Sequence, residues 1–262
     1  MDYPIAPPHL EALDKTLAKY RACTEGFGYV ENGILLMEGL AFCAMADELG
    51  VDLVIESGVA GGGSTEIWAS YFSCPIFAIE FTLTYGKERF EETKRRLHKY
   101  PHITFIEGDS FFVIENLVRR YPDKRIALFV DGPKGNAAVA LVRNMLSYSN
   151  VVLAALHDQG KPSSPAYHSM DGMDGLLFYT DQNDYARRYL HLDLDRPNAA
   201  LTRELNQFPN GPGLGLAGNP AGAAASSWET FQTRFAYHCH RTRSWLFAKR
   251  YGFILARLIP EP

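Results

Sequence analysis

Acidic residues and glycines in the first two thirds of the chain follow short apolar runs. The first run, residues 53–55, meets Glu56 and then a turn with glycines at positions 58, 61, 62 and 63; Ser64 and Thr65 begin a helical pattern. Glycine permits positive φ and close backbone approach, and the free amides at a helix start favour an anion. The stretch therefore predicts a cradle for an anionic or nucleotide-like ligand. A tight turn that needs glycine for geometry alone is the alternative.

Four further apolar runs also end on polar residues. These endings are Glu80, which lies 22 residues after Gly58; Gly108-Asp109-Ser110; Asp131-Gly132-Pro133-Lys134; and His157-Asp158. A single acid at a strand end is most simply a helix N-cap. Ligands of open parallel sheets bind at the carboxyl ends of the strands, so five polar endings in register indicate one shared site.

A regular alternation of strands and helices would position these residues. The predicted strands are 52–56, 75–80, 103–106, 126–130 and 151–156, and the helices between them are 64–73, 86–99, 110–121 and 136–148. Runs that are apolar on both faces are typical of buried parallel strands, and one helix between each pair makes right-handed βαβ units. The sequence predicts an α/β fold: a Rossmann-like, doubly wound, mostly parallel sheet with helices on both faces.

The regions outside this alternation are less regular. Helices are predicted at 8–22 and 32–49, either as a simple covering layer or as an overhang beside the glycine turn. After a loop at 159–175, a helix is predicted at 184–193, and the Gly/Ala/Pro-rich stretch 207–227 predicts a long surface loop or lid. A helix at 228–240 and strand-like runs at 244–249 and 252–258 complete the chain, and we expect those runs to form an antiparallel hairpin on the sheet edge.

Composition narrows the class of protein. The 262 residues are 47% hydrophobic and carry a formal net charge of −4, which argues against a nucleic-acid partner. The four cysteines are scattered without a C-x-x-C pair, typical of reduced thiols in the cytoplasm. We find no signal peptide or membrane-spanning run, so we expect no membrane partner. A homo-oligomer is compatible with the sequence.

These strand endings resemble those of class I S-adenosylmethionine (SAM)-dependent methyltransferases over about residues 50–160. Within that superfamily, the loop from Glu56 to Ser64 is similar to the glycine-glycine-serine loop of the cephalosporin-hydroxylase-like and rhamnosyl O-methyltransferase group. The resemblance implies a single domain over 1–262, with a helical cover (1–50), a cofactor-binding core (51–160) and a substrate or lid region (161–262). Two related folds fit less well: dinucleotide binders prefer G-x-G-x-x-G, and a Walker loop needs Gly-Lys-Ser/Thr.

The resemblance also implies roles for single residues. Glu80 would accept hydrogen bonds from the ribose hydroxyls, Asp109 would accept one from the adenine amino group, and Asp131 would lie beneath the sulfonium and the substrate. The methionine part would meet the backbone amides around the glycine loop, with Ser64 near its carboxylate. The implied cofactor contacts are Glu56, Gly58, Gly62, Ser64, Glu80, Asp109, Ser110 and Asp131.

The chemistry implied is in-line methyl transfer to the hydroxyl of a small molecule or sugar (EC 2.1.1.-). The hydroxyl could be activated by Mg²⁺ held by Asp131 and Asp158, although His157 stands where an acid is usual. Without metal, His157, His168 or Lys134 are the candidate bases. Two other readings stay open: a non-catalytic or repurposed SAM-binding protein, and a nicotinamide-dependent Rossmann oxidoreductase.

Overall fold

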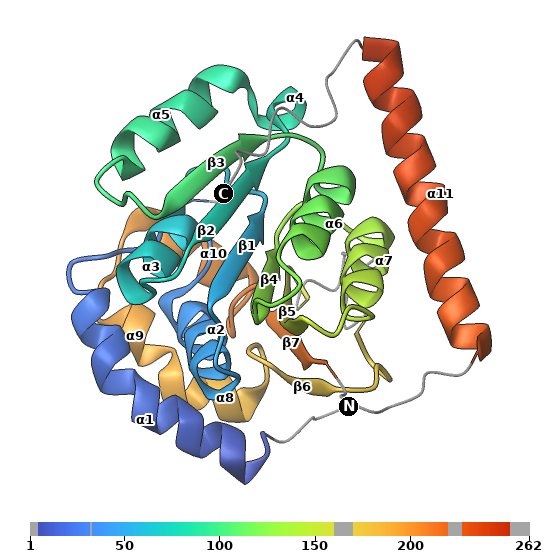
Figure 1. The fold of residues 1–262 in the computed structure, drawn as a ribbon. Helices are drawn as coiled ribbons and strands as arrows, with labels where there is room; N and C mark the ends of the chain where they lie inside the picture. The colour runs from blue at the N-terminus through green and yellow to red at the C-terminus, as the bar shows by residue number, and fades with distance from the viewer. Residues whose placement is uncertain (1–4, 32, 160–169, 220–226, 252–262) are drawn as a thin grey trace.

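A single mixed sheet organises the computed structural model, which describes residues 5–31, 33–159, 170–219 and 227–251. Within these residues, seven strands pair in the order β3-β2-β1-β4-β5-β7-β6 (Figure 1). Strands β1 to β5 are parallel, whereas β7 pairs antiparallel with both β5 and β6. The strands are β1 (Leu53–Ser57), β2 (Ile76–Glu80), β3 (Ile103–Glu107), β4 (Ile126–Val130), β5 (Val151–His157), β6 (Leu176–Tyr179) and β7 (Leu214–Gly218). The predicted Rossmann-like sheet is confirmed.

The strand order reverses between β1 and β4, which lie side by side in the centre of the sheet. Every residue of β1, β2, β4 and β5 is buried, as the apolar runs predict. Such a switch point opens a crevice outside the carboxyl ends of the two central strands. The register pairs Ser57 with Val130, so the residues that follow β1 and β4 emerge next to each other.

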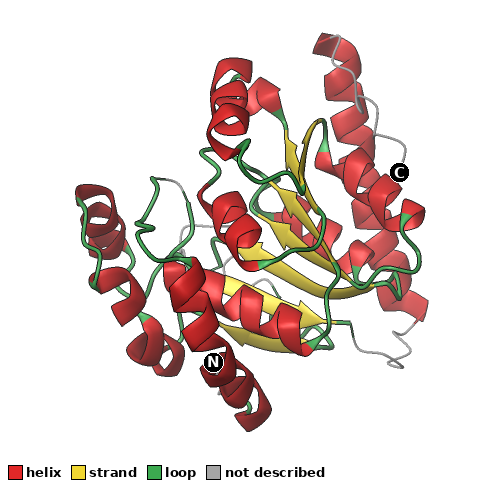
Figure 2. Cartoon of the chain, turned by 60° about the vertical axis from the view of Figure 1, so that its left-hand side comes forward, coloured by secondary structure: helices red, strands yellow, loops and turns green. Residues whose placement is uncertain are grey.

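Helices cover both faces of the sheet (Figure 2). One face packs against α1 (Pro7–Cys23), α2 (Leu36–Glu48), α3 (Gly63–Tyr71), α8 (Asn183–Tyr189), α9 (His191–Leu194) and α10 (Ala199–Gln207). The other packs against α6 (Ser110–Arg120), α7 (Asn136–Met145) and α11 (Ser227–Tyr251). Two more, α4 (Thr82–Tyr85) and α5 (Lys87–Leu97), connect β2 to β3. None of the helices in the described ranges is both long and apolar enough to cross a membrane.

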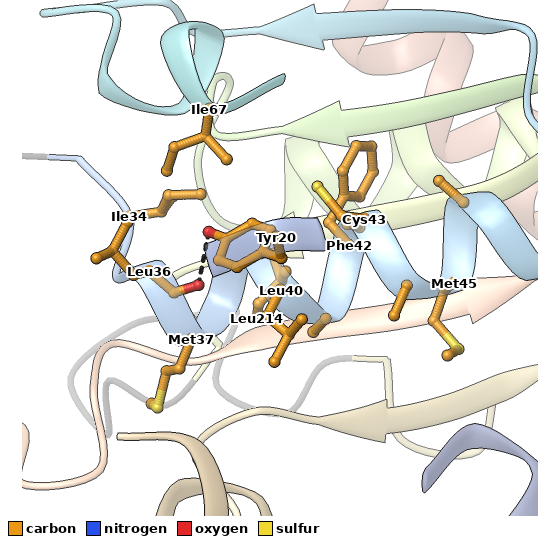
Figure 3. Close-up of a cluster of buried hydrophobic side chains, with 14 of the residues drawn as sticks. Tyr20, Ile34, Leu36, Met37, Leu40, Phe42, Cys43, Met45, Ile67 and Leu214 are labelled. Atoms are coloured by element: carbon orange, nitrogen blue, oxygen red, sulfur yellow. Dashed lines mark hydrogen bonds between the residues drawn. The ribbon is translucent and has the colours of Figure 1, made fainter. Parts of the chain in front are cut away.

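Helix α2 is buried almost along its whole length (Figure 3). The hydroxyl of Tyr20 on α1 donates a hydrogen bond to the carbonyl of Leu36 at 2.8 Å. Gly39 permits this approach, since a Cβ atom there would lie 2.3 Å from the Tyr20 hydroxyl oxygen. Glu38 stands beside it, fully buried, and the other buried residues of α2 are apolar. A fully buried acid in such a place needs partners, and those partners are at the strand ends.

The predicted lid at 207–227 is wrong in its central part, because β7 occupies Leu214–Gly218 there and is mostly buried. The small residues that suggested a loop are required by packing. A Cβ atom at Gly215 would lie 2.7 Å from a ring carbon of Tyr179 on the neighbouring strand. Composition alone does not separate this close strand packing from a flexible loop.

The predicted C-terminal hairpin is also wrong where it can be compared. Residues 244–249 continue α11, and the predicted strand at 252–258 lies outside the described residues. The antiparallel strands of the sheet are instead β6 and β7. Figure 1 shows α11 running along α6 and α7. Tyr237 fixes it there by donating to the carbonyl of Phe111 at 2.9 Å and to Glu115 Oε2 at 2.7 Å.

Candidate functional site

Ser57, the last residue of β1, ties three strand ends together. Its carbonyl accepts hydrogen bonds from the amides of Asp131 and Gly132, at 2.8 and 3.0 Å. Its hydroxyl lies 2.5 Å from the hydroxyl oxygen of Ser110 and also donates to the carbonyl of Gly132. The ends of β1, β3 and β4 therefore form one connected surface. No role for Ser57 was predicted from the sequence, although its position after Glu56 at a strand end was a signal for one.

The glycine turn is held tightly by the chain around it. Gly58 has φ +90°, and a Cβ atom there would lie 2.7 Å from the amide nitrogen of Gly132. Gly62 has φ +71° and caps α3, and a Cβ atom there would lie 2.6 Å from Thr93. Geometry thus accounts for glycine at both positions. The turn still delivers the start of α3, whose first amides have no acceptor within the helix.

Glu56 and Ser64 brace this turn from inside. Glu56 is fully buried and accepts hydrogen bonds from the Ser64 hydroxyl and, at 2.6 Å, from the Thr65 hydroxyl. Burial raises the pKa of the Glu56 carboxyl to about 7, against the two hydroxyls, which lower it. Since the Ser64 hydroxyl is engaged with Glu56, a ligand at this helix start would meet backbone amides.

Glu80 joins the end of β2 to the glycine turn. Its carboxylate accepts from the amide of Ala60 at 2.7 Å and from the amide of Phe81 at 3.0 Å, and the residue is 4% exposed. Burial raises the pKa of Glu80, and these amides oppose the rise. The two amides bond to different carboxylate oxygens, and each oxygen has a second lone pair for a ligand hydroxyl.

Asp109 and Ser110 lie at the end of β3. Asp109 is the N-cap of α6, where its Oδ1 accepts from the amide of Phe111 at 2.9 Å. Burial raises its pKa, whereas hydrogen bonds from Phe111 and from Ser244 on α11 lower it. The simple capping role therefore exists here. The second carboxylate oxygen leaves room for a ligand contact as well.

Charged side chains gather at the ends of β4 and β5. Lys134 Nζ donates to Asp158 Oδ2 at 2.7 Å and also to Asp131 Oδ1, while His157 Nδ1 lies 2.9 Å from Asp131 Oδ1. A carboxylate only accepts hydrogen bonds, so this geometry places a proton on His157 Nδ1. Asp131, His157 and Asp158 each offer a ligand atom within 4.8 Å of the others. Asp131, His157 and Lys134, predicted for catalysis, thus meet in one cluster with Asp158, predicted as a metal ligand.

The protonation of this cluster follows from its charges. Burial disfavours the charged imidazole of His157, but Asp131, Asp158 and Glu38 outweigh it and raise its pKa to about 10. Likewise Asp131 and Asp158 raise the pKa of Lys134 despite the opposing effect of burial. Burial alone would raise the pKa of Asp131, yet His157 and Lys134 lower it. At neutral pH the cluster holds two cations between carboxylates.

Glu38 completes the cluster from the N-terminal region. Its Oε2 lies 3.4 Å from His157 Nε2 and accepts from the amide of Leu35 at 2.8 Å. Val30 also reaches the glycine turn: a Cβ atom at Gly63 would lie 3.1 Å from Val30 Cβ. The N-terminal region therefore overhangs the site. The sequence carried one signal for Glu38, its place as an acid inside an apolar helix. His168, the other candidate base, lies outside the described residues.

Comparisons with known proteins found similarity to solved structures but none to protein families or curated sequences. No protein-family model matches the chain, and no curated protein matches its sequence. Among solved structures, the chain is similar to the SAH-bound Podospora anserina methyltransferase PaMTH1, with 13% identity, a TM-score of 0.42, and coverage of 82% of this chain and 88% of that one. The chain itself has a Rossmann-like fold, shown by its mostly parallel sheet with helices on both faces.

Two further solved structures are similar to a comparable degree. Cofactor-bound Rv0187 from MTB shares 16% identity at a TM-score of 0.45, with coverage of 82% of this chain and 91% of that one. The O-methyltransferase TomG from Streptomyces achromogenes, in complex with SAM, shares 15% identity at a TM-score of 0.41, covering 65% and 81% respectively. The function is therefore inferred below from the residues of this chain.

Proposed function

We propose that this protein is a SAM-dependent methyltransferase that transfers a methyl group to the hydroxyl of a small molecule or sugar. The observation that carries this proposal is the row of carboxylates at the ends of four neighbouring strands. Glu80 ends β2, Asp109 follows β3, and Asp131 follows β4. The glycine turn follows β1, which lies between β2 and β4 in the sheet. Hydrogen bonds from Ala60 to Glu80 and between Ser57 and Ser110 join these positions into one surface.

The polar groups at these strand ends match the successive parts of the SAM molecule. The first amides of α3 suit the methionine carboxylate, Glu80 suits the two ribose hydroxyls, and Asp109 suits the adenine amino group. Glu80 and Asp109 are 4% and 7% exposed, and each has lone pairs beyond those taken by backbone amides. Asp131 provides a negative charge towards the sulfonium. When bound, the cofactor supplies an activated methyl group.

The residues at β4 and β5 would act on the acceptor. The Lys134 side chain is 57% exposed, so its ammonium can donate to an acceptor oxygen. Lys134 and His157 are protonated at neutral pH, so a carboxylate oxygen of Asp131 or Asp158 would receive the hydroxyl proton. Held by Glu80, Asp109 and the start of α3, the cofactor would supply its methyl group to the acceptor oxygen. His157 would hold Asp131 in place through its Nδ1 proton.

Isothermal titration calorimetry tests the cofactor assignment. We expect wild-type protein to bind SAM and S-adenosylhomocysteine but not NAD⁺. Glu80→Ala should weaken SAM binding by at least about 100-fold, because it removes two hydrogen bonds to a charged group, each worth about 1.5–3 kcal/mol. Glu91→Ala is the matched control, an exposed acid paired only with Lys94 in a surface ion pair. Equal SAM affinity in wild type and Glu80→Ala would contradict the proposed pocket.

One observation favours the alternative of a SAM-binding protein without transferase activity. Both nitrogen groups of the cluster, Lys134 and His157, are paired with carboxylates and keep their protons. Mass spectrometry of wild-type protein with SAM and a panel of phenols, enols and sugars separates the two functions. Methylated product supports the transferase, whereas SAM affinity without product from any acceptor supports the binding protein.

A further inference from the structure

Lys134 occupies the space between two carboxylates that come from neighbouring parallel strands. Its ammonium donates to Asp158 Oδ2 at 2.7 Å and to Asp131 Oδ1, which accounts for one oxygen of each acid. The two acid side chains are 14% and 17% exposed, so most of their surface is withdrawn from water. A cation therefore already sits where two acids at adjacent strand ends would otherwise attract one.

The third member of the cluster is also engaged. A metal ligand needs a lone pair on imidazole, which a protonated nitrogen lacks. His157 Nδ1 carries the proton that it donates to Asp131 Oδ1 at 2.9 Å, and Nε2 lies 3.4 Å from Glu38 Oε2. The imidazole is thus held between two carboxylates. Its Nδ1 donates a hydrogen bond in this arrangement, and binding a metal ion through Nδ1 would require that nitrogen to lose its proton.

Charge balance leads to the same result. Asp131 and Asp158 contribute two negative charges, Glu38 adds a third beside His157, and the Lys134 ammonium bonds to both aspartates. A divalent ion at Asp131 and Asp158 would have to displace this ammonium or enter directly beside it. Mg²⁺ also prefers a shell of oxygen atoms, whereas Mn²⁺ and Zn²⁺ accept imidazole nitrogen. The residues present therefore do not fit the magnesium site that the sequence suggested.

We propose that the Lys134 ammonium is the built-in cation of this site, and that it excludes divalent metal ions from Asp131 and Asp158. Removing the ammonium frees one oxygen on each carboxylate and relieves the positive charge, so the cluster becomes able to bind Mn²⁺. The exclusion of metal follows from the cluster alone. The further role of Lys134, to donate to the acceptor oxygen in place of a metal, rests on the proposed function.

Titration of full-length protein with Mn²⁺, followed by electron paramagnetic resonance, tests this proposal without an activity measurement. We expect wild type to show no saturable binding at millimolar Mn²⁺. Lys134→Ala should gain one site and bind at least about tenfold more tightly than wild type, and the double variant Lys134→Ala/Asp158→Asn should lose that gain. Lys124→Ala is the matched control, because Lys124 pairs with the exposed Asp52 at 3.5 Å.

Three outcomes would overturn the proposal: saturable binding by wild type, no gain in folded Lys134→Ala, or a gain that survives Asp158→Asn. Circular dichroism reports folding, and Lys134→Met, which keeps the length of the side chain, replaces Lys134→Ala if that variant does not fold. SAM calorimetry on the same samples keeps the two proposals apart. If SAM binds but Mn²⁺ binding does not follow the expected pattern, only the built-in cation is contradicted. If Mn²⁺ binding follows the pattern but SAM does not bind, only the proposed function is contradicted.

Discussion

The two halves of the strand-end surface hold their carboxylates in opposite ways. Around β1 to β3, Glu56, Glu80 and Asp109 are buried among hydroxyls and backbone amides, and burial raises the pKa of each. Around β4 and β5, Asp131 is surrounded by His157 and Lys134, which lower its pKa. The first half pairs its carboxylates with neutral hydrogen-bond donors, and we call it the uncharged half. The second pairs its carboxylates with cations, and we call it the charged half.

This difference shows what each half can do. A carboxylate that faces neutral donors suits neutral hydroxyl and amino groups, which is the chemistry of a ribose and an adenine. A cluster of paired charges suits an acceptor whose oxygen gains negative charge during a reaction. Ser57 joins the two halves, so a change that leaves Ser57 in place should leave the other half largely intact. Variants in each half can therefore test the comparison.

The largest expected effect is on stability in the charged half. Asp131→Ala removes the 2.9 Å partner of a buried imidazolium, so we expect it to lower the free energy of unfolding by about 3 kcal/mol at pH 7. Urea denaturation measures this. The loss should shrink as pH falls through the lowered pKa of Asp131. It should also shrink as pH rises from about 6.5 towards the raised His157 pKa of about 10, where the imidazole loses its charge.

The control for this variant is Asp195→Ala. Asp195 pairs with Arg21 at 3.5 Å, with side chains 61% and 49% exposed, and such surface pairs contribute about 0–1 kcal/mol. If Asp131→Ala and Asp195→Ala lose the same stability, the charge pairing at β4 and β5 is no stronger than a surface pair, and the contrast between the halves disappears.

A second prediction concerns pH dependence in the uncharged half. The folded-state pKa of Glu56 is about 7, above the ordinary glutamate value of 4.5, so between these values the folded protein binds more protons than the unfolded chain. Stability contributed by Glu56 therefore falls as pH rises from about 4.5 to about 7. The total fall should be about 3 kcal/mol.

Glu56→Gln removes this titration and keeps a hydrogen-bond acceptor for the two hydroxyls. We compare the free energies of unfolding of variant and wild type between pH 5 and pH 8 (about the range of the Glu56 titration). As pH rises, the variant should become more stable relative to wild type. Glu91→Gln, at an exposed site, should show no such shift. A constant difference for Glu56→Gln across this range would show that Glu56 remains ionised throughout, as an exposed glutamate does.

The sequence predicted the central fold well because both halves lie on short buried strands. Residues 53–55 and 126–130 are apolar on both faces, which is typical of strands in a parallel sheet covered by helices. The polar endings were found for the same reason, since an acid that ends an apolar run stands out. The predicted cofactor and cluster residues consequently meet where the strands end.

The parts that the sequence missed depend on long-range contacts. Glu38 is an isolated acid in an apolar helix, and its closeness to His157 depends on how α2 packs on the sheet. Strand β7 has glycines typical of a loop, and at Gly215 the packing against Tyr179 leaves no room for a side chain. Local composition reports neither contact. Protonation of His157 was missed likewise, since its three acidic neighbours come from different segments.

The smallest expected effect separates capping from ligand binding in the uncharged half. Asp109 and Asn198 are both N-caps, accepting from backbone amides of Phe111 at 2.9 Å and Leu201 at 2.8 Å. Asp109→Ala and Asn198→Ala should each lower the free energy of unfolding by about 1 kcal/mol, because each leaves a helix amide without its acceptor. Only Asp109→Ala should also weaken SAM binding, by about tenfold, which corresponds to one hydrogen bond. Equal SAM affinities in the two variants, measured by calorimetry, would reduce Asp109 to a cap and confine the cofactor contacts to Glu80 and the start of α3.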